Sequence, residues 1–476
     1  MESFIEHLSA SIWAMVMRGI PNKQQTIAQS SPSFHAEIPI LSVKNVRNGL
    51  PIVLPSDNEF SKIIDDVFIV CSDTPEGEFL TISDTSLTVA NLHLYKLLNR
   101  DAQTLEAQSG EYGSESNTAG SLLWELPCCE FDGIWENLIF DDSIKDELLS
   151  YVYALVRLSE KNTNTTVLRV NRMILLHGIA LHVAGPPGTG KTSLCRALAQ
   201  KLAIRFSQKY KRIYFVEINS HGLFSKFFSE SGKLIQSMFK QIEELAEDPK
   251  AFVFVLIDEV ESLTIARSAL LNRNEPTDAI RAVNAVLTQV DYIRRRSNIF
   301  IFTTSNITEA RLLFFSKASK NDCIYEIYDC IYEKRNFLLQ NFWILSLDEA
   351  FTDRTDLSRF VGYPSANAVY AIFRSCIQEM QRIGIVEPGP WFSERYASGP
   401  HCEKLMQLSR SASGLSGRCL RQLPVIGYSK LPVDQLSIEQ CLGVLEKALK
   451  EKLSENVRCL PSDLNARRKI TTASVG

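Results

Sequence analysis

The chain has 476 residues, of which 45% are hydrophobic and 22% are charged, and its formal net charge is -4 at neutral pH. This length gives room for about two to four domains, each with its own hydrophobic core. The composition excludes a disordered chain, and the slightly acidic balance excludes a protein that coats nucleic acid with positive charge. We therefore expect a multidomain globular protein that does not bind nucleic acid directly.

The cysteines and the N-terminus indicate the compartment. The 11 cysteines are scattered, with no CxxC pair and no Cys/His cluster at zinc spacing, which predicts reduced thiols and no structural metal. Glu2 and Glu6 stand where a signal peptide carries positive charge, and no stretch approaches the roughly 18 apolar residues of a membrane-spanning helix. We expect an intracellular protein that does not enter a membrane.

The N-terminal region reads as a small domain followed by a linker. Short β-rich runs between residues 34 and 100 are separated by Pro, Gly, Asp and Ser, and predict an α+β domain. The segment 101–121, DAQTLEAQSGEYGSESNTAGS, is polar and aperiodic, as linkers are. We expect the domain and its linker to occupy residues 1–125.

Alternating strand and helix signals follow. Continuous apolar runs, typical of parallel strands covered on both faces, occur at 213–218, 252–258 and 299–306. Amphipathic helical stretches, such as SLCRALAQKL and DAIRAVNAVLTQVDYI, accompany them. The pattern predicts an α/β domain with a doubly wound parallel sheet over residues 126–362. Helical signals dominate afterwards, so we expect a smaller helical domain over residues 363–476.

The strongest motif is GPPGTGKT, residues 185–192, which satisfies the phosphate-loop pattern GxxxxGK[ST]. In such a loop the backbone N–H groups surround the phosphates, the lysine reaches the β- and γ-phosphates, and the final hydroxyl ligates Mg²⁺. Lys191 and Thr192 take these last two roles. The backbone cradle would consist of Gly185, Pro186, Pro187, Gly188, Thr189 and Gly190. We expect ATP and Mg²⁺ as cofactors of a P-loop NTPase.

Further polar residues stand at the ends of the predicted strands. Asp258 and Glu259 follow the run FVFVLI, and Asn306 ends the next run along the chain. If these strands reach the phosphate loop, Asp258 would hold Mg²⁺ through water and Glu259 would activate the attacking water. Asn306 would orient that water. In isolation, two acids after a strand also fit a helix cap, and Asn306 also fits a turn.

These elements, in this order, resemble the AAA+ ATPases. The longer strings KTSLCRALAQKLAIRF, VEINSHGLFSKFFSESGKL, VFVLIDEVESLT, TTSNITEA and GLSGRCLRQLP resemble one branch, the pachytene checkpoint protein 2 family, also known as the thyroid receptor-interacting ATPase. The resemblance covers residues 130–476, apart from two interruptions, and is weak over residues 1–125. It implies an ATP-hydrolysing homo-hexamer that remodels HORMA-domain proteins, with a helical lid at the C-terminus.

The resemblance also implies roles for particular residues. Arg354, in AFTDRTD, would be an arginine finger that reaches the γ-phosphate held by the neighbouring subunit. Arg418, in GLSGR, would contact the nucleotide of its own chain from the lid. Trp135 lies in the stretch that borders the adenine, and we expect it to pack rather than to contact the base. A pore loop whose rings grip an extended client would consist of Lys226, Phe227 and Phe228.

The same resemblance implies a biological setting. The N-terminal domain would dock a HORMA-domain client through an adaptor, and the ring would pull on one end of that client. The implied processes are the control of meiotic recombination and synapsis, and the spindle checkpoint. We expect a nuclear, chromosome-associated protein with an additional cytoplasmic pool.

Two interruptions depart from the family pattern. The family runs a strand such as MILLHG directly into PPGTGKT, whereas here IALHVAG, residues 179–185, intervenes. The residues 173–185 would span roughly 43 Å as one strand, which is too long, so we expect IALHVA to replace MILLHG in the core. A shifted phosphate loop is the alternative. A second segment, residues 311–346, separates TTSNITE from the region of Arg354.

Our hypothesis is that both segments come from an alternative or imperfect transcript, and a dominant cDNA that encodes both would contradict it. The competing idea is a lineage-specific regulatory insert. A rival function follows, in which the chain binds nucleotide and partners but does not hydrolyse ATP. A clamp-loader-like DNA machine would need a basic face, and a membrane AAA protease would need an HExxH motif and a membrane span, none of which is evident.

Overall fold

The chain forms two compact units, residues 1–94 and 95–476. In the first unit, the short strands β1 (Pro51–Ile52) and β2 (Val67–Phe68) pair in antiparallel fashion. The computed structural model describes residues 51–52, 67–68, 95–105, 121–141, 143–161, 167–168, 170–180, 188–219, 231–260, 277–308, 351, 353–389, 399–431 and 433–458.

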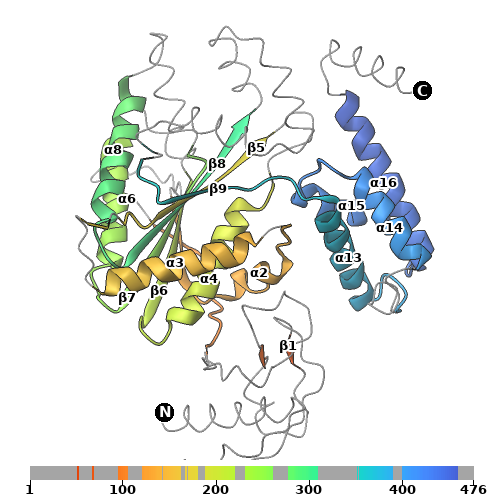
Figure 1. Ribbon diagram of the computed structural model, residues 1–476, viewed down its shortest axis with the longest axis horizontal. Coiled ribbons are helices and arrows are strands. Elements are labelled where there is room, and N and C mark those ends of the chain that lie inside the picture. Colours follow the sequence, from red (N-terminus) through yellow and green to blue (C-terminus); the bar gives the residue numbers. More distant parts are fainter. Residues whose placement is uncertain are drawn as a thin grey trace, which may run out of the picture. The chain divides into compact units, whose positions relative to one another are not determined.

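A mixed sheet forms the centre of the second unit (Figure 1). Within the described residues it has seven strands, in the order β3-β4-β6-β7-β8-β5-β9. Strands β6, β7, β8, β5 and β9 are parallel to one another, whereas β4 is antiparallel to both β3 and β6. Their bounds are β3 (Gln103–Thr104), β4 (Ser121–Leu126), β5 (Met173–Ala180), β6 (Arg212–Asn219), β7 (Ala251–Asp258), β8 (Ile299–Thr308) and β9 (Leu357–Phe360).

Helices cover both faces of this sheet, as the continuous apolar runs predicted. Helices α6 (Ser231–Leu245) and α8 (Thr277–Ile293) pack on one face, and α3 (Ile144–Glu160) and α4 (Lys191–Phe206) pack on the other (Figure 1). Alternate side chains of β7 enter the two cores, Val253, Val255 and Ile257 on the first face and Phe252, Phe254 and Leu256 on the second. Each strand must therefore be apolar on both sides.

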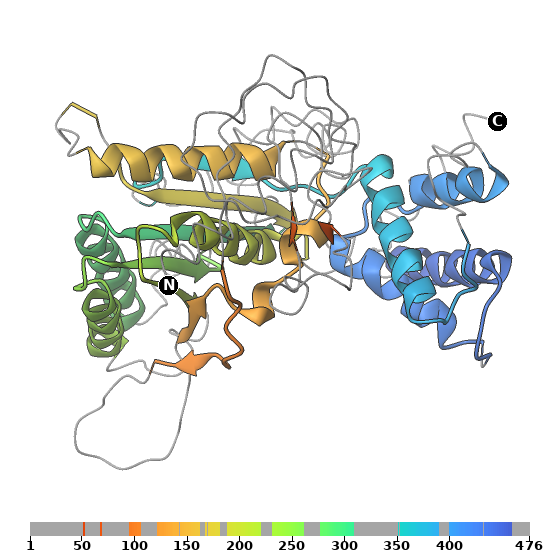
Figure 2. The ribbon, with the colours of Figure 1, turned by 90° about the horizontal axis from the view of Figure 1, so that it is seen from below.

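The predicted helical region after residue 363 is present as a lid with its own hydrophobic core. Figure 2 shows its helices, in blue tones, packed against one another. They are α13 (Ala366–Arg382), α14 (Pro400–Ser411), α15 (Gly417–Tyr428) and α16 (Ile438–Arg458). The Ser365 side chain caps α13 by accepting hydrogen bonds from the backbone N–H groups of Asn367 and Ala368. Within the described part of the chain, none of the helices combines the length and apolar character needed to cross a membrane.

The division between the units differs from the predicted boundary after residue 125. The second unit begins at Tyr95, because β4 pairs with β6 along its whole length and so joins the central sheet. Part of the expected linker, Gln103–Thr104, is strand β3 at the edge of the same sheet. Residues 106–120 of that segment lie outside the described residues.

The expectation that IALHVA replaces MILLHG in the core is wrong. Strand β5 begins at Met173, and its residues through Gly178 are buried. Met173 and Leu175 enter one core while Ile174 and Leu176 enter the other, and the backbone pairs with β8 on one side and β9 on the other. MILLHG forms the core strand because two neighbouring strands and two helical layers bury it. The length of the apolar run alone does not reveal these partners.

Two glycines of the lid test its packing. A Cβ added at Gly427 would lie 2.9 Å from the Val444 carbonyl oxygen, whereas one added at Gly443 meets nothing within 4 Å. We expect Gly427→Ala to destabilise the lid by about 1 to 3 kcal/mol, because the backbones of α15 and α16 must separate. The matched Gly443→Ala should be neutral or stabilising by about 1 kcal/mol. Thermal unfolding followed by circular dichroism checks both, and equal midpoints for the two variants would contradict the close approach.

Candidate active site

The phosphate loop leads into α4. The structure describes the loop from Gly188 onward. Gly188 and Gly190 have φ angles of 153° and 95°, which glycine adopts readily and other residues rarely do. Helix α4 starts at Lys191, so its N–H groups and the positive end of its dipole face the loop, as an anion site requires. The predicted cradle residues Gly185, Pro186 and Pro187 lie outside the described residues.

Gly178, at the end of the core of β5, is a site residue that the sequence motif did not single out. A Cβ added there would lie 2.8 Å from the Val361 carbonyl oxygen and 3.1 Å from the Lys191 ammonium group. Thr189 Oγ1 would lie at 3.7 Å. This part of β5, two residues before the strand ends at Ala180, therefore lies directly against Lys191 and Thr189. The sequence contains a signal for Gly178, because it is the last residue of MILLHG, the string that precedes PPGTGKT in the family pattern.

Lys191 is buried at the foot of the loop, with 6% of its surface exposed, and its ammonium group donates to Thr189 Oγ1 at 3.1 Å. His177 lies on β5 beside it. Burial, and then the charge of Lys191, lower the pKa of His177 to about 3. The imidazole is consequently neutral at physiological pH, and the positive charge at this point belongs to Lys191.

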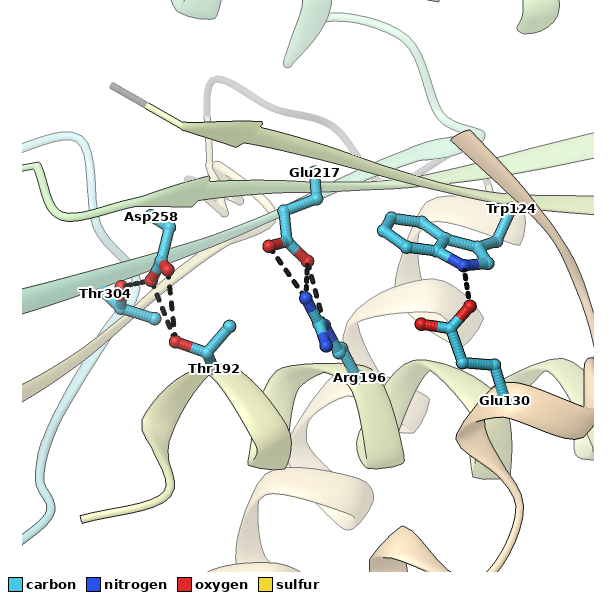
Figure 3. Close-up of polar contacts among 7 residues, drawn as sticks. All are labelled: Trp124, Glu130, Thr192, Arg196, Glu217, Asp258 and Thr304. Carbon is cyan, nitrogen blue, oxygen red and sulfur yellow. Dashed lines mark hydrogen bonds and ion pairs between the residues drawn. The ribbon is translucent and has the colours of Figure 1, made fainter. Parts of the chain in front are cut away.

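Thr192 and Asp258 meet between α4 and the sheet (Figure 3). The Thr192 hydroxyl lies 3.0 Å from Asp258 Oδ1 and 3.2 Å from Oδ2. One hydroxyl and one carboxylate that converge in this way fit Mg²⁺, which takes few protein ligands and completes its shell with phosphate and water oxygens. Within the described residues no cluster of three His, Cys, Asp or Glu side chains could hold another metal ion.

Glu259 and Asn306 complete the carboxyl edge of the sheet. Glu259 directly follows β7, and the next residue, Val260, donates its N–H to the Thr304 carbonyl oxygen of β8 at 2.9 Å. Asn306 is two residues further along β8 and is the register partner of Gly178 on β5. The structure thus brings Asp258, Glu259 and Asn306 to one edge of the sheet, as parallel strands require. Asp258 meets Thr192 of α4 there.

Arg418 reaches the phosphate loop from the lid. Its backbone N–H donates to the Gly188 carbonyl oxygen at 3.2 Å, and a Cβ at Gly188 would lie 2.9 Å from Arg418 Cβ. Ser416, which caps α15, lies beside the same glycine. The predicted lid arginine and the phosphate loop are therefore in contact within one chain.

Arg354 lies in a different environment. Its Nε donates to Asp291 Oδ1 at 2.9 Å and its Nη2 to Oδ2 at 2.6 Å, and its side chain is 21% exposed. Burial favours a higher pKa for Asp291, but the hydrogen bond from Arg354 and the nearby guanidinium charges outweigh it and lower that pKa. Asp291, on α8, also pairs with Arg294. No local sequence pattern predicts this partner, because Asp291 and Arg354 are 63 positions apart.

Two other predictions have different outcomes. Trp135, on the short helix α2 (Ile134–Asn137), packs against the core beneath α3 and α4, and the Lys145 ammonium lies 5.1 Å from its ring centre. It packs, as expected. The pore-loop residues lie outside the described residues, and they are Lys226, Phe227 and Phe228.

A partly buried ion pair fixes the middle of α4 to the sheet. The Arg196 guanidinium binds the Glu217 carboxylate through Nε and Nη2, both at 2.9 Å (Figure 3). Its guanidinium carbon also lies 5.5 Å from the ring centre of Trp124, which donates from Nε1 to Glu130 at 2.6 Å. Burial raises the pKa of Glu217, and Arg196 opposes that rise.

We expect Arg196→Met to cost about 1 to 3 kcal/mol, since it leaves the partly buried Glu217 charge without its partner. The folded-state pKa of Glu217 would rise further above its unfolded value. Stability should then be lost as the pH rises through that folded-state pKa, so the deficit should be larger at about pH 8 than at about pH 5. Denaturant unfolding at both pH values measures it. The control Arg196→Met with Glu217→Gln should lose this pH dependence, and a deficit independent of pH in the single variant would contradict it.

Comparison with known proteins places this arrangement. Two family models match the chain, the ATPase family associated with various cellular activities (AAA) over residues 181–317 and the Pch2 N-terminal domain over residues 18–97. The pachytene checkpoint protein 2 of Caenorhabditis elegans is 42% identical over 427 residues, which is 87% of this chain and 90% of that protein. The human pachytene checkpoint protein 2 homologue is 40% identical over 384 residues, or 78% of each chain.

The solved structure of Caenorhabditis elegans PCH-2 is similar to the whole fold. It is 40% identical, has a TM-score of 0.65, and the match covers 86% of this chain and 90% of that one. The match extends over most of both proteins. The chain therefore belongs to the pachytene checkpoint protein 2 family of AAA+ ATPases.

Proposed function

We propose that this chain hydrolyses ATP and uses the energy, as a homo-hexamer, to open HORMA-domain proteins. The observation that carries the proposal is the meeting of Thr192 with Asp258 at the start of α4, with Glu259 next to it. Family membership supports ATP hydrolysis as the chemistry and HORMA-domain proteins as the client class. The match to the Pch2 N-terminal domain over residues 18–97 supports a docking role for that region, through an adaptor.

In the proposed reaction, water attacks the γ-phosphorus, the bond from phosphorus to the β,γ-bridging oxygen breaks, and ADP and inorganic phosphate leave. Glu259 accepts the proton of the attacking water and Asn306 orients that water. Lys191 binds the β- and γ-phosphates, and Arg418 contacts the nucleotide from the lid. Thr192 and Asp258 would hold Mg²⁺, directly or through water, and the ion would offset the charge that develops on the phosphates.

Arg354 would act on the neighbouring subunit, where its guanidinium stabilises the transition state. Its side chain is held by Asp291 and is partly exposed, which suits a group that a second subunit must reach. Lys226, Phe227 and Phe228 remain the proposed pore loop, and their rings would grip an extended client without regard to its sequence. We place the activity in the nucleus, in meiotic recombination, synapsis and spindle-checkpoint control, on family grounds alone.

A second function is favoured by one observation at the end of β5. The strand continues past Gly178, with Ile179 paired to Ile307 and Ala180 to Thr308. The family pattern requires the chain to turn into the phosphate loop directly after Gly178. Here the strand continues instead. A loop that is displaced by this extension would bind nucleotide and leave it unhydrolysed, and the chain would act as an interaction or regulatory module.

Replacement of the proposed base tests the chemistry. We expect Glu259→Gln to reduce the ATP turnover number at least about 100-fold and to leave nucleotide affinity intact, because a neutral amide cannot take the proton of water. Phosphate release and equilibrium nucleotide binding measure the two effects. The exposed Glu247→Gln is the matched control and should behave as wild type. Wild-type turnover by Glu259→Gln would show that another group is the base.

Deletion of residues 179–185, which joins Gly178 to Pro186, separates the two functions. We expect the full chain to assemble and hydrolyse ATP, and the deletion to change turnover by less than about threefold, since a change in loop length costs little entropy. Steady-state ATPase assays and the mass of the assembly check this, with deletion of residues 311–346 as a parallel variant. Hydrolysis by the shortened chain alone would favour the regulatory module.

A further inference from the structure

Thr304 is a buried residue of β8 whose hydroxyl and carbonyl oxygen contact the residues at the acidic end of β7. Its surface is 1% exposed. Its hydroxyl donates to Asp258 Oδ1, the same hydroxyl oxygen accepts from the backbone N–H of Glu259 at 3.2 Å, and its carbonyl oxygen accepts from the N–H of Val260 at 2.9 Å. Figure 3 shows the side chain beside Asp258. One residue thus contacts three consecutive residues of the neighbouring chain segment.

The backbone at Glu259 needs such a hold. Its φ angle is 58°, in the left-handed region, and Arg172 is the other non-glycine residue with positive φ in the described part of the chain. A side-chain-bearing residue in this conformation costs about 1 to 3 kcal/mol and persists where its surroundings fix it. The two amide hydrogen bonds to Thr304, from Glu259 and Val260, are contacts that fix it here.

The direction of each hydrogen bond follows from the chemistry of the groups. A backbone amide only donates and an ionised carboxylate only accepts, so the Thr304 proton must point to Asp258 and a lone pair must face Glu259. The same hydroxyl contacts both acidic residues at once, Asp258 through its proton and Glu259 through its oxygen. It therefore links the orientation of the Asp258 carboxylate to the backbone from which the Glu259 side chain leaves.

We propose that Thr304 is a positioning residue for hydrolysis, which sets the direction of the Glu259 carboxylate and fixes one oxygen of Asp258 while the carboxylate faces Thr192. This inference rests on the proposed function, in which Glu259 is the base. Thr304 touches neither nucleotide nor water in this role and acts through the two acids. Preorganisation of this kind raises the turnover number and leaves ground-state binding unchanged, because the base acts only in the transition state.

The adjacent Thr303 provides a matched control. It is also fully buried, and its hydroxyl donates to the Ile174 carbonyl oxygen of β5 at 3.0 Å, away from the two acids. Thr303→Val and Thr304→Val each remove one buried hydroxyl from the same strand and keep the β-branched shape. Their effects on stability should be similar, so a difference in catalysis reports the position of the hydroxyl.

The experiment measures turnover number, KM for ATP, ADP affinity and thermal unfolding for the full chain. We expect Thr304→Val to lower the turnover number about 30-fold with KM and ADP affinity within about twofold of wild type. Thr304→Ser, which keeps the hydroxyl, should restore turnover to within about threefold. Thr303→Val should retain wild-type turnover. Adding Thr304→Val to Glu259→Gln should cause no further loss, since both act on one step.

Four results would overturn the proposal. They are wild-type turnover by Thr304→Val, failure of Thr304→Ser to restore it, equal losses in Thr303→Val and Thr304→Val, and a loss in KM rather than in turnover. If Thr304→Val does not fold, Thr304→Ala takes its place with the same expectations. Failure of the proposed function is a separate result, because it would appear as wild-type turnover by Glu259→Gln whatever the Thr304 variants do.

Discussion

Helix α4 carries two polar side chains toward the sheet, and each one finds a carboxylate at a strand end. Thr192 meets Asp258 of β7, and Arg196 meets Glu217 of β6. These contacts determine where the helix begins, and so where its N-terminal N–H groups and Lys191 face the phosphates. Because the helix face around them is otherwise apolar and buried, a carboxylate without its partner would be costly there. The geometry of the site depends on these two polar contacts between α4 and the sheet.

The charged side chains at and near the site are arranged in a simple way. Lys191 is buried and stays available for phosphate, while the nearby His177 is neutral because burial and the lysine suppress its protonation. On α8, Asp291 is shared between Arg294 and Arg354. Positive charge is thus present where anionic phosphate is expected, and the two arginines beside α8 are balanced by Asp291.

The sequence predicts the parts of this structure that depend on local pattern. The apolar runs of β6, β7 and β8 need no knowledge of the fold, and the phosphate loop with Asp258 and Glu259 identifies the chemistry. The sequence does not predict the parts whose structure depends on contacts with distant segments of the chain. IALHVA and MILLHG are both good strands, and only the flanking β8 and β9 select the second. Strand β4 follows a polar segment, and its place depends on β6, which lies far along the chain. Thr304 and Asp291 have ordinary sequence contexts, so only the contacts reveal them.

The hydrogen bond from Arg418 N–H to the Gly188 carbonyl oxygen joins the phosphate loop to the lid through main-chain atoms. Helix α15 begins at this bond, and α16 packs on α15 so closely that Gly427 touches Val444. A displacement of the phosphate-loop backbone would therefore be transmitted to the lid through these contacts. Helix α16 has 21 residues and is about 32 Å long, so a tilt of about 5° would move its far end by about 3 Å. Only a proline at position 418 would remove the donor, so this transmission withstands almost every side-chain substitution.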